Sequence, residues 1–492
     1  MWTKESLCAL VQDRLANYLF IVVSNREPYI HTHVGSEIRC QVPASGLTVA
    51  LDPVMRACGG TWIAHGSGDA DREVVDDKNK VPVPPEAPEY TLKRVWLSKE
   101  EEDGYYFGFS NEALWPLCHI SYTRPIFDEA DWNTYKKVNQ LFARAVLEEV
   151  GNRKAFVFVQ DYHLALLPRL IRQANPNVII AQFWHIPWPN REAFRICPWQ
   201  EEILDGLLGN HLLGFHIRYH CNNFLDTIDR ALEARVDHDR YEVSRGGKKT
   251  AVRPFPISVD FEEVSREAQG GEVAAEIERL RKRLGLRGEL VGIGLDRIDY
   301  TKGIPDRFRA FDHFLEKWPE YKERVVFVQA AVPSRIHIGA YKRLNEEIDS
   351  LVEEINWKYA SGHWKPIHYL REHCSLLTLM ALRRMANFCV VSSLHDGMNL
   401  VAKEFVASRF DEDGVLILSP FTGAARELTD ALLVNPYATD HFAEAIKKAL
   451  EMPATERQRR MRRMRETVRE NNIYKWAGDI ISELARFESG AG

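Results

Sequence analysis

The chain has no closely spaced cysteines, no hydrophobic run long enough to cross a membrane and no excess of positive charge. Its eight cysteines include no Cys-x-x-Cys pair, so neither a structural zinc site nor a disulfide framework is indicated. The longest apolar runs, such as 19–23 and 156–159, have the length of strands and fall far short of the roughly 20 residues that span a bilayer. With 64 Lys and Arg against 70 Asp and Glu, the formal charge is −6. This balance argues against a generic nucleic-acid binder, which carries a basic surface.

Signals for export are missing as well. Residues 1–17 mix charged side chains with leucines and contain no apolar core of a signal peptide. No Asn-X-Ser/Thr sequon for glycosylation occurs anywhere in the sequence. Together with the scattered cysteines, these absences predict a cytoplasmic protein with free thiols and no membrane partner.

The sequence is rich in short apolar runs that alternate with amphipathic stretches. Apolar residues make up 45% of the 492 positions, and a chain of this length predicts two or three domains at roughly 100–200 residues each. Uninterrupted runs of Val, Ile and Phe indicate parallel strands covered by helices on both faces, which is the α/β fold class. The predicted strands are 19–24, 155–160, 179–185, 213–216, 290–295, 325–330, 388–392 and 415–419.

A change of composition divides these strands into two equal sets. Between residues 260 and 288 the chain is rich in Glu, Arg, Gln and Gly, which indicates a boundary segment with an amphipathic helix. We therefore predict two Rossmann-like, doubly wound parallel-sheet domains that face each other across a cleft. Their expected bounds are 1–258, completed by a C-terminal helix at 474–492, and 259–473. One large sheet is the alternative, but it would exceed the usual size of a single core.

Polar, charged and aromatic residues follow the ends of the predicted strands. In an open α/β sheet, ligands bind at the carboxyl ends of the strands, so this edge is the predicted active site. Ordinary loop polarity would explain one or two such turns, but it explains poorly a set so rich in Arg, Asp and His. The turns are Ser24–Arg26, Gln160–His163, His185–Trp188, Asp296–Asp299, Pro333–Arg335 and Ser393–Gly397.

The first motif with a chemical meaning runs from Asp296 to Gly303. It places Arg297 and Lys302 just beyond a strand end. An Arg fork and a Lys point charge suit a diphosphate, and both would stabilise the negative charge of a departing phosphate. A surface salt bridge with Asp299 or Asp306 would explain the same spacing.

The second motif runs from Asp396 to Glu404 and is predicted to be a turn that leads into a helix. Backbone N–H groups from Gly397 through Met398 and Asn399 to Leu400 would then form an anion site at the start of the helix. Asp396 and Glu404 are carboxylates that can accept hydrogen bonds from the hydroxyls of a nucleotide sugar. Asp396 could equally be a helix N-cap, which is a common role for Asp.

The third set consists of aromatic and arginine residues that suit a sugar phosphate, since aromatic rings pack on sugar faces and guanidinium groups bind phosphate. Its members are Arg26, Trp62, Tyr105, Tyr106, Trp115 and Arg335. Aromatic residues at this density are also typical of a core, so Tyr106 and Trp115 could serve packing alone.

Several familiar signatures are absent. The sequence contains no GxxxxGK[ST] phosphate loop, no complete GxGxxG, no GxSxG and no HExxH. Asp69-Ala70-Asp71 resembles a pair of metal-binding carboxylates, but it has no apolar flanks, and we expect a solvated loop. No metal site is predicted.

Taken in order, these segments resemble the trehalose-6-phosphate synthase family, which are retaining glycosyltransferases of the two-domain GT-B type. The resemblance covers residues 20 to 484 and is specific, because separate motifs follow one another at the family's spacing. The matching segments are Ser24–Arg26, Ser45–Leu47, Tyr106–Pro116, Asp161–His163, His185–Pro189, Arg297–Gly303, Pro333–Arg335, Asp396–Glu404, Gly423–Ala425 and Glu427–Leu428.

The resemblance implies transfer of glucose from a nucleoside diphosphate-glucose to glucose-6-phosphate, giving α,α-trehalose-6-phosphate with no metal and no cofactor. It implies an acceptor site of Arg26, Trp62, Tyr106, Trp115, Asp161 and Arg335. It implies a donor site of Gly46, His185, Arg297, Lys302, Asp396, Gly397, Met398, Asn399, Leu400 and Glu404. Of these, His185, Arg297, Lys302 and Asp396 would be catalytic. The family has no established protein nucleophile, and the donor's own phosphate is thought to take the proton of the attacking hydroxyl.

This sequence also departs from the family pattern. Glu27 and Pro28 follow Arg26, residues 29–41 lengthen the next loop, His65–Gly68 replaces a Gly-Trp-Ser-Gly, and His395 stands where Arg is common. Because these changes border both predicted pockets, the acceptor could instead be glycerol-3-phosphate, and the donor base could be that of UDP, GDP or ADP.

A sugar-phosphate sensor without catalysis is the alternative from another class. A separate phosphatase is expected to act on the product, because no Asp-x-Asp-x-Thr signature is present. The sequence leaves a homo-oligomer open.

Overall fold

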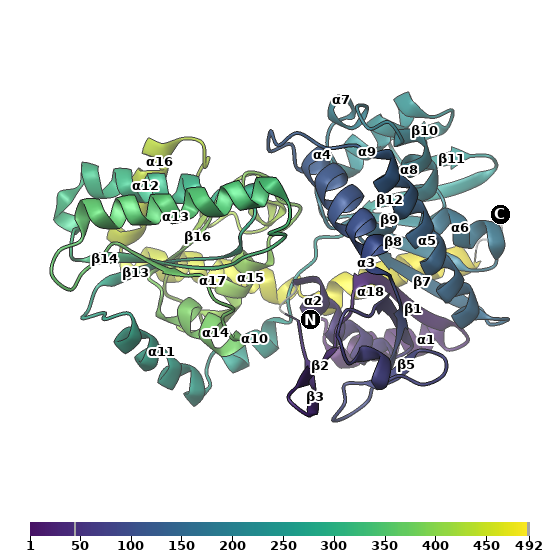
Figure 1. Cartoon of the computed structure of the whole chain (residues 1–492), viewed down its shortest axis with the longest axis horizontal. Helices are drawn as coiled ribbons and strands as arrows, with labels where there is room; N and C mark the ends of the chain where they lie inside the picture. Colours follow the sequence, from purple (N-terminus) through teal and green to yellow (C-terminus); the bar gives the residue numbers. More distant parts are fainter. Residues whose placement is uncertain (44–45, 490–492) are drawn as a thin grey trace. The chain divides into compact units, whose positions relative to one another are not determined.

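The computed structural model describes residues 1–43 and 46–489, and the chain divides into two compact units. The first unit comprises Met1–Ile257 and the C-terminal segment that begins at Ile473, and the second comprises Ser258–Asn472. Each unit has its own sheet, covered by helices (Figure 1). Ser45 of the predicted glycine loop lies outside the described residues, and Gly46 is the first residue of a helix.

The first unit is built on a ten-stranded sheet with the order β10-β11-β12-β9-β8-β7-β1-β4-β6-β5. Strands β12 through β6 in this order are parallel, and the antiparallel strands β10, β11 and β5 close the two edges. The strand order reverses direction between β1 and β7, which makes this position the topological switch point of the sheet. The strands are β1 (Leu19–Arg26), β4 (Thr61–His65), β5 (Lys80–Val83), β6 (Tyr90–Val95), β7 (Ala155–Gln160), β8 (Ile179–Phe183), β9 (Leu212–Phe215), β10 (Arg235–Asp237), β11 (Glu242–Arg245) and β12 (Lys248–Pro254).

Helices cover both faces of this sheet. Helices α1, α2 and α18 pack together, and α5, α6 and α8 form a second group (Figure 1). The C-terminal helix belongs to this unit because Trp476 packs against Phe158 and Phe183, with ring centroids 5.7 and 5.1 Å away. The helices are α1 (Lys4–Leu15), α2 (Gly46–Cys58), α3 (Lys99–Glu102), α4 (Trp115–His119), α5 (Glu129–Val150), α6 (Leu167–Ala174), α7 (Arg191–Phe194), α8 (Gln200–Leu207), α9 (Arg218–Ala231) and α18 (Ile473–Ser489).

Two segments expected to be loops have a different structure. The stretch 29–41 forms an antiparallel hairpin of β2 (Ile30–Val34) and β3 (Glu37–Gln41). The predicted solvated loop at 69–71 is wrong for Asp71, which is fully buried because it accepts hydrogen bonds from the backbone of His31 and Gly68. Neither feature was predicted. The alternation of Ile38 and Cys40 with polar residues in β3 was not read as a strand, and Asp71 has no apolar flanks.

The second unit contains a fully parallel six-stranded sheet with the order β15-β14-β13-β16-β17-β18. This is the strand order of a doubly wound Rossmann sheet, with its switch point between β13 and β16. The strands are β13 (Leu290–Arg297), β14 (Val325–Val332), β15 (Ile367–Leu370), β16 (Phe388–Val391), β17 (Val415–Leu418) and β18 (Leu432–Leu433).

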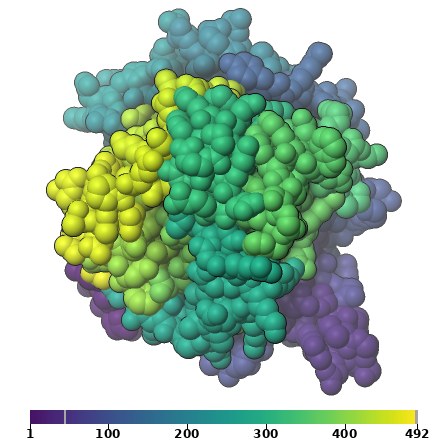
Figure 2. Space-filling view, turned by 90° about the vertical axis from the view of Figure 1, so that its left-hand side faces the viewer, coloured from purple at the N-terminus to yellow at the C-terminus, as the bar shows by residue number. Residues whose placement is uncertain are grey.

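In the second unit, α12, α13 and α16 cover one face of the sheet and α11, α14 and α15 the other (Figure 1). The space-filling view shows yellow residues of this unit beside teal-green ones, in agreement with the packing of α16 against α12 (Figure 2). The helices are α10 (Phe261–Glu267), α11 (Gly271–Arg283), α12 (Ile304–Lys317), α13 (Gly339–Tyr359), α14 (Leu376–Met385), α15 (Leu400–Ser408), α16 (Thr439–Glu451) and α17 (Ala454–Glu470).

All eight predicted strands are present as buried parallel strands, and the α/β, doubly wound class is confirmed. The prediction missed five further parallel strands, β4, β6, β12, β15 and β18. In β6, Lys93 and Arg94 interrupt the apolar residues, although both side chains are buried. The eight cysteines are free. Within the described ranges, no helix combines the length and apolarity needed to cross a bilayer.

The arginine-rich helix α17 packs onto the rest of the second unit through buried Met461, Met464 and Val468 and through salt bridges. Arg457 pairs with Asp413 at 2.6 Å and Arg462 with Glu412 at 2.7 Å. Arg465 is buried, and its guanidinium donates to the carbonyl oxygens of Val406 and Ala407 at 3.2 and 2.7 Å. These carbonyls belong to the last turn of α15, where helix carbonyls have no partner within the helix.

Arg465→Met should therefore destabilise the protein, because it keeps the aliphatic volume but leaves the carbonyl of Ala407 without its side-chain donor, whereas the carbonyl of Val406 still accepts the N–H of Arg409 at 3.3 Å. We expect a loss of about 1–3 kcal/mol in the free energy of unfolding, measured by urea denaturation followed by circular dichroism. Arg459→Met is the matched control, because Arg459 is exposed on the same helix and should change stability by less than about 0.5 kcal/mol. Equal urea midpoints for the two variants would contradict the capping role.

Candidate active site

The loops that follow β13 and β16 are in close backbone contact at the switch point of the second unit. The loop after β13 forms a short turn, Tyr300–Lys302, and leads into α12 through Gly303 at φ +61°. The N–H of Leu394, in the loop after β16, donates to the carbonyl of Thr301 at 2.7 Å. A Cβ on Gly303 would lie 2.4 Å from the carbonyl oxygen of Ser392, so only glycine allows the loops to approach this closely.

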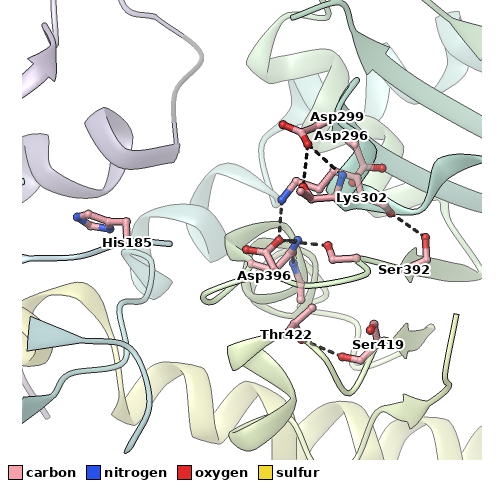
Figure 3. A network of polar contacts seen from close by, with 12 residues as sticks. His185, Asp296, Asp299, Lys302, Ser392, Asp396, Ser419 and Thr422 are labelled. Carbon is pink, nitrogen blue, oxygen red and sulfur yellow. Dashed lines mark hydrogen bonds and ion pairs between the residues drawn. The ribbon is translucent and has the colours of Figure 1, made fainter. Parts of the chain in front are cut away.

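Lys302 and Asp396 meet across these loops. The Lys302 ammonium lies 2.6 Å from Asp396 Oδ2, as Figure 3 shows. The same oxygen accepts hydrogen bonds from Ser393 Oγ and Asn399 Nδ2 at 3.1 and 3.2 Å. Asp396 is not the N-cap of α15, because Asn399 fills that position and accepts the N–H of Ala402 at 3.1 Å. Asp396 thus holds a lysine and an amide in place at the head of a helix.

The turn after Asp396 packs closely onto a second loop. Asp396 pairs with Thr422 through an isolated bridge, and a Cβ on Gly423 would lie 2.1 Å from the carbonyl oxygen of Gly397. The Thr422 hydroxyl donates to the carbonyl of Ser419 at 3.0 Å (Figure 3). Met398 is buried, so this residue offers its backbone rather than its side chain. The backbone N–H groups of residues 397–400, which were predicted to form an anion site, are therefore held in place by the loop around Thr422 and Gly423.

A buried carboxylate, Asp299, organises the cations of this site. Asp299 Oδ1 accepts the N–H and the hydroxyl of Thr301 at 3.0 and 2.9 Å. Asp299 Oδ2 lies 3.4 Å from Arg335 Nη1 and accepts the Tyr341 hydroxyl at 2.9 Å. Burial alone would raise the pKa of Asp299, but the charges of Arg335, Arg297 and Lys302 together with the Thr301 N–H hold it below its ordinary value. Three predicted site cations therefore act on one carboxylate.

The other carboxylate predicted in this unit, Glu404, has a fixed partner. It forms an ion pair with Arg383 of α14. The neighbouring Lys403 is buried and pairs with Glu427 at 2.6 Å, and burial lowers its pKa. The sequence analysis named Glu427 only as part of a matching segment and did not predict Arg383, Tyr341 or Glu427 as partners, because each is far along the chain or lies inside a helix.

In the first unit, residues from β1, a π-helix and the turn after β7 come together. Arg26 Nη2 donates to the Tyr106 hydroxyl at 3.0 Å. The Tyr106 ring stacks on His163 at 5.6 Å and 15° between planes, and His163 lies 4.0 Å from the Tyr162 ring. The sequence analysis missed His163 as a site residue, although it belongs to the Asp-Tyr-His turn that was singled out.

The π-helix Asp103–Leu114 places Tyr106 and leads directly into α4 at Trp115. A Cβ on Gly108 would lie 2.3 Å from Asp131 Oδ2 of α5, so the glycine allows the two helices to pack closely. Trp115 packs against His119 in a tilted arrangement, with ring centroids 4.1 Å apart and 35° between the ring planes. π-helical segments are rare and often occur at functional sites.

Asp161 and His185 are linked at the ends of β7 and β8. Asp161, at φ +72°, accepts the backbone N–H of His185 at 3.1 Å. His185 Nε2 lies 2.8 Å from Gln160 Oε1. Because the amide oxygen of Gln160 can only accept, His185 carries its proton on Nε2. Burial, together with the nearby His163, lowers the pKa of His185 to about 3, so the ring is neutral near neutral pH.

Trp62 is fully buried behind Arg26. Its indole N–H donates to Ser24 Oγ at 2.8 Å, and this hydroxyl donates in turn to the carbonyl of Arg26 at 2.6 Å. Trp62, on β4, is thus linked to the backbone of Arg26 on the neighbouring strand β1 through the hydroxyl of Ser24.

The structure brings the predicted residues together in two groups, one at each switch point. The first unit holds Arg26, Trp62, Tyr106, Trp115, Asp161 and His185, and the second holds Arg297, Lys302, Arg335, Asp396 to Leu400 and Glu404. Gly46 begins α2 in the first unit and has no described contact with either group. Among the described residues, no cluster of three or more His, Cys, Asp and Glu side chains could hold a metal ion. The second group is suited to a diphosphate, and the first combines an arginine with aromatic rings.

Comparisons with known proteins agree in pointing to one family. The sequence model of glycosyltransferase family 20 matches residues 18–486. The trehalose-6-phosphate synthase of Mycolicibacterium vanbaalenii is 37% identical over 481 residues, which cover 96% of this chain and 97% of that protein. The bifunctional trehalose-6-phosphate synthase/phosphatase of Thermoproteus tenax is 38% identical over 480 residues, and these cover 95% of this chain but only 64% of that protein's length.

A solved structure is similar over the same extent. It is an α,α-trehalose-phosphate synthase (UDP-forming) from Burkholderia xenovorans in complex with glucose-6-phosphate. It has a TM-score of 0.84 and 32% sequence identity, and the match covers 95% of this chain and 99% of the other.

Asp299→Asn should destabilise the protein at neutral pH by about 3 kcal/mol, because it removes a buried charge that faces Arg335. A depressed carboxylate pKa contributes stability above the ordinary value of 3.8, and this contribution is lost as the pH falls through the lower folded value. The difference between wild type and variant in the free energy of unfolding should therefore shrink in acid. Asp349→Asn is the control, because Asp349 forms an exposed pair with Arg371 and should change stability by less than about 1 kcal/mol. A difference that stays constant with pH would contradict this role of Asp299.

Proposed function

This chain belongs to glycosyltransferase family 20, and from that premise we propose how its two groups of residues carry out one reaction. It transfers glucose from a nucleoside diphosphate-glucose to glucose-6-phosphate, forming α,α-trehalose-6-phosphate with retention of the donor's anomeric configuration. Two units with the GT-B type of fold carry out this transfer. The observations that carry the division of roles are two contacts, that of Lys302 with Asp396 at 2.6 Å in the second unit and that of Arg26 with Tyr106 at 3.0 Å in the first.

In this proposal, the second unit binds the donor. Arg297 and Lys302 hold the diphosphate, which gains negative charge as the glucosyl bond breaks. The Lys302–Asp396 pair, at 2.6 Å, supports this role because Asp396 fixes the ammonium before the donor arrives. Glu404 accepts hydrogen bonds from the ribose, and the backbone groups from Gly397 to Leu400 face the phosphates at the start of α15.

The first unit binds the acceptor sugar in this proposal. Arg26 binds its phosphate, Tyr106 and Trp115 pack on the ring, and Asp161 accepts a hydroxyl. Arg335 of the second unit adds a charge to the acceptor phosphate, and Trp62 holds the backbone of Arg26. The 3.0 Å contact between Arg26 and Tyr106 supports the first assignment, because it sets the guanidinium beside an aromatic ring.

The chemistry follows from charge and position rather than from a protein nucleophile. The bond between the anomeric carbon and the diphosphate oxygen breaks, the acceptor hydroxyl forms the new bond, and its proton passes to the departing diphosphate. His185 is neutral and contacts the donor glucose. Positioning of this kind can lower the barrier by about 7–11 kcal/mol.

UDP-glucose is our proposed donor, because the Burkholderia xenovorans relative is described as UDP-forming. The protein is proposed to act in the cytoplasm, where its eight free cysteines stay reduced. A separate phosphatase is proposed to act on the product.

The reaction is tested by incubating the purified chain with UDP-, GDP- or ADP-glucose and with glucose-6-phosphate or glycerol-3-phosphate. We expect a phosphorylated non-reducing disaccharide, identified by mass spectrometry and by the two α-anomeric proton signals in NMR. UDP-glucose with glucose-6-phosphate should give the highest rate. Failure of every donor would overturn the function, and turnover with glycerol-3-phosphate alone would reassign the acceptor.

Arg297→Ala should lower kcat/KM by about 30- to 1000-fold, because one charge-assisted contact to the departing diphosphate is lost. The assay is the same transfer reaction with varied UDP-glucose. Arg279→Ala is the matched control, because Arg279 is exposed on α11 of the same unit and should leave kcat/KM unchanged. A value near wild type for Arg297→Ala would remove this residue from the mechanism.

A further inference from the structure

One residue of the proposed donor site, Glu404, is held by an arginine that has no assigned role. Arg383, in the last turn of α14, forms an ion pair with Glu404 of α15 through its Nη2 and the carboxylate Oε2. The two helices pack against each other on one face of the second sheet (Figure 1). The side chains are only 10% and 20% exposed, so salt screens this pair less than it screens a surface salt bridge.

The backbone of Arg383 is fixed by a second arginine, Arg409, which follows α15 directly. Arg409 Nη1 donates to the carbonyl of Arg383 at 3.2 Å. Asp411 holds this guanidinium in turn, because its two carboxylate oxygens accept Nε and Nη2 of Arg409 at 3.0 Å each. Arg409 thereby ties the end of α14 to the end of α15, and the two helices keep the Arg383 and Glu404 backbones at a set separation.

The Arg383 side chain is bound less completely than that of Arg409. All three nitrogens of Arg409 donate hydrogen bonds, to Asp411 and to the carbonyls of Arg383 and Ala386. Among the described residues, Glu404 is the only acceptor for the side chain of Arg383, whose buried Nε has no hydrogen-bond partner. A buried N–H without an acceptor destabilises a fold, so stability alone explains this arginine poorly.

The ion pair leaves one oxygen of Glu404 available to a ligand. Arg383 engages Oε2, and within the part of the chain that the structure describes Oε1 accepts no hydrogen bond. Both oxygens of a carboxylate can accept, and Glu404 keeps some exposure. A ligand hydroxyl can therefore donate to Oε1, and Arg383 determines that this is the oxygen on offer.

The pair also offsets the charge that Glu404 brings to the donor site. Glu404 follows Leu400, the first residue of α15, by about one helical turn. An unpaired carboxylate this close to a bound diphosphate would repel it. The neighbouring Lys403 is paired with Glu427 at 2.6 Å, so neither Lys403 nor Glu404 adds net charge. The first turns of α15 thus offer a hydrogen-bond acceptor without opposing the diphosphate.

We propose that Arg383 is a positioning residue for the donor, which fixes Glu404 so that Oε1 accepts a ribose hydroxyl and the second unit selects ribonucleotides over deoxyribonucleotides. The inference rests on the proposed function, which places Glu404 at the ribose. A site built to bind a hydroxyl rejects the analogue that lacks it, because the acceptor is then left without its donor. Without Arg383, the Glu404 side chain is free to turn and its charge opposes the diphosphate, so the hydroxyl is no longer recognised.

Calorimetric titration of the full chain with UDP, 2′-deoxy-UDP and 3′-deoxy-UDP tests this inference. The wild type should bind UDP at least about tenfold more tightly than one of the two deoxy forms, as expected for a hydrogen bond to a charged acceptor. In Arg383→Met this ratio should fall below about threefold, because Glu404 is no longer fixed. A merely structural role would instead weaken the binding of UDP and of its deoxy forms equally.

Arg384→Met is the matched control. Arg384 is the next residue of α14 and is 15% exposed, but it pairs with Asp411 at 3.1 Å, beyond the last residue of α15, so its variant should keep the wild-type ratio. Glu404→Ala, alone and combined with Arg383→Met, tests whether the arginine acts through Glu404. Both should show the same ratio as Arg383→Met, because residues that share one interaction do not have additive effects. Circular dichroism of each variant establishes that it is folded.

A wild-type ratio in Arg383→Met would overturn the inference. So would equal binding of UDP and both deoxy forms by the wild type, a result that needs no variant and decides the matter even if Arg383→Met does not fold. Discrimination without transfer from any donor would overturn the proposed reaction and leave the inference standing, whereas transfer from UDP-glucose without discrimination would do the reverse. If UDP does not bind, ADP, GDP and their deoxy forms take its place, and failure of all three nucleotides to bind would overturn both.

Discussion

In the second unit, the site cations are held in place by two carboxylates that they contact, the buried Asp299 and the half-buried Asp396. At the carboxyl ends of parallel strands, several positive side chains gather where a phosphate is to bind, and in its absence they repel one another. In the second unit, Asp299 and Asp396 offset this repulsion and fix the side chains that they contact. Desolvating these two carboxylates destabilises the fold only modestly, because each also accepts hydrogen bonds from neutral donors. These donors are Thr301 and Tyr341 for Asp299 and Ser393 for Asp396. A phosphate then meets cations whose positions are already set, which is the condition for strong electrostatic stabilisation.

Much of the fold was predictable from the sequence, because buried parallel strands are continuous apolar runs and their ends are marked by polar residues. Two of the features that escaped prediction, β6 and the burial of Asp71, have a common cause: they contain charged residues whose burial depends on a distant partner. Strand β6 was missed because Lys93 and Arg94 are charged in sequence but buried in the structure. Asp71 was expected in solvent for the same reason. A charged side chain is expected to be exposed when only its neighbours in sequence are considered. It can be buried only because a partner distant in sequence pairs with it in the fold.

The candidate site shows the same limit. The segments at both switch points were found because Arg, Lys, Asp and His cluster after strands, and the order of the segments carried the family resemblance. The pairing of Lys302 with Asp396 could not be found, because the two residues are 94 positions apart and meet only because β13 and β16 are neighbours. The capping role of Asn399, one of several polar residues in its turn, also needed the backbone. The substrate roles of these residues remain predictions.

The last helix of the chain completes the unit that the first residues begin. Helix α18 packs with α1 and α2, and its Trp476 fills the space beside β7 and β8. During synthesis, the whole of the second unit leaves the ribosome before this helix does. The second unit can thus reach its native state first, while an apolar face of the first unit stays uncovered until α18 is made. Such a folding order leaves that apolar face uncovered for about the time needed to synthesise residues 258–472, at roughly 5–20 residues per second.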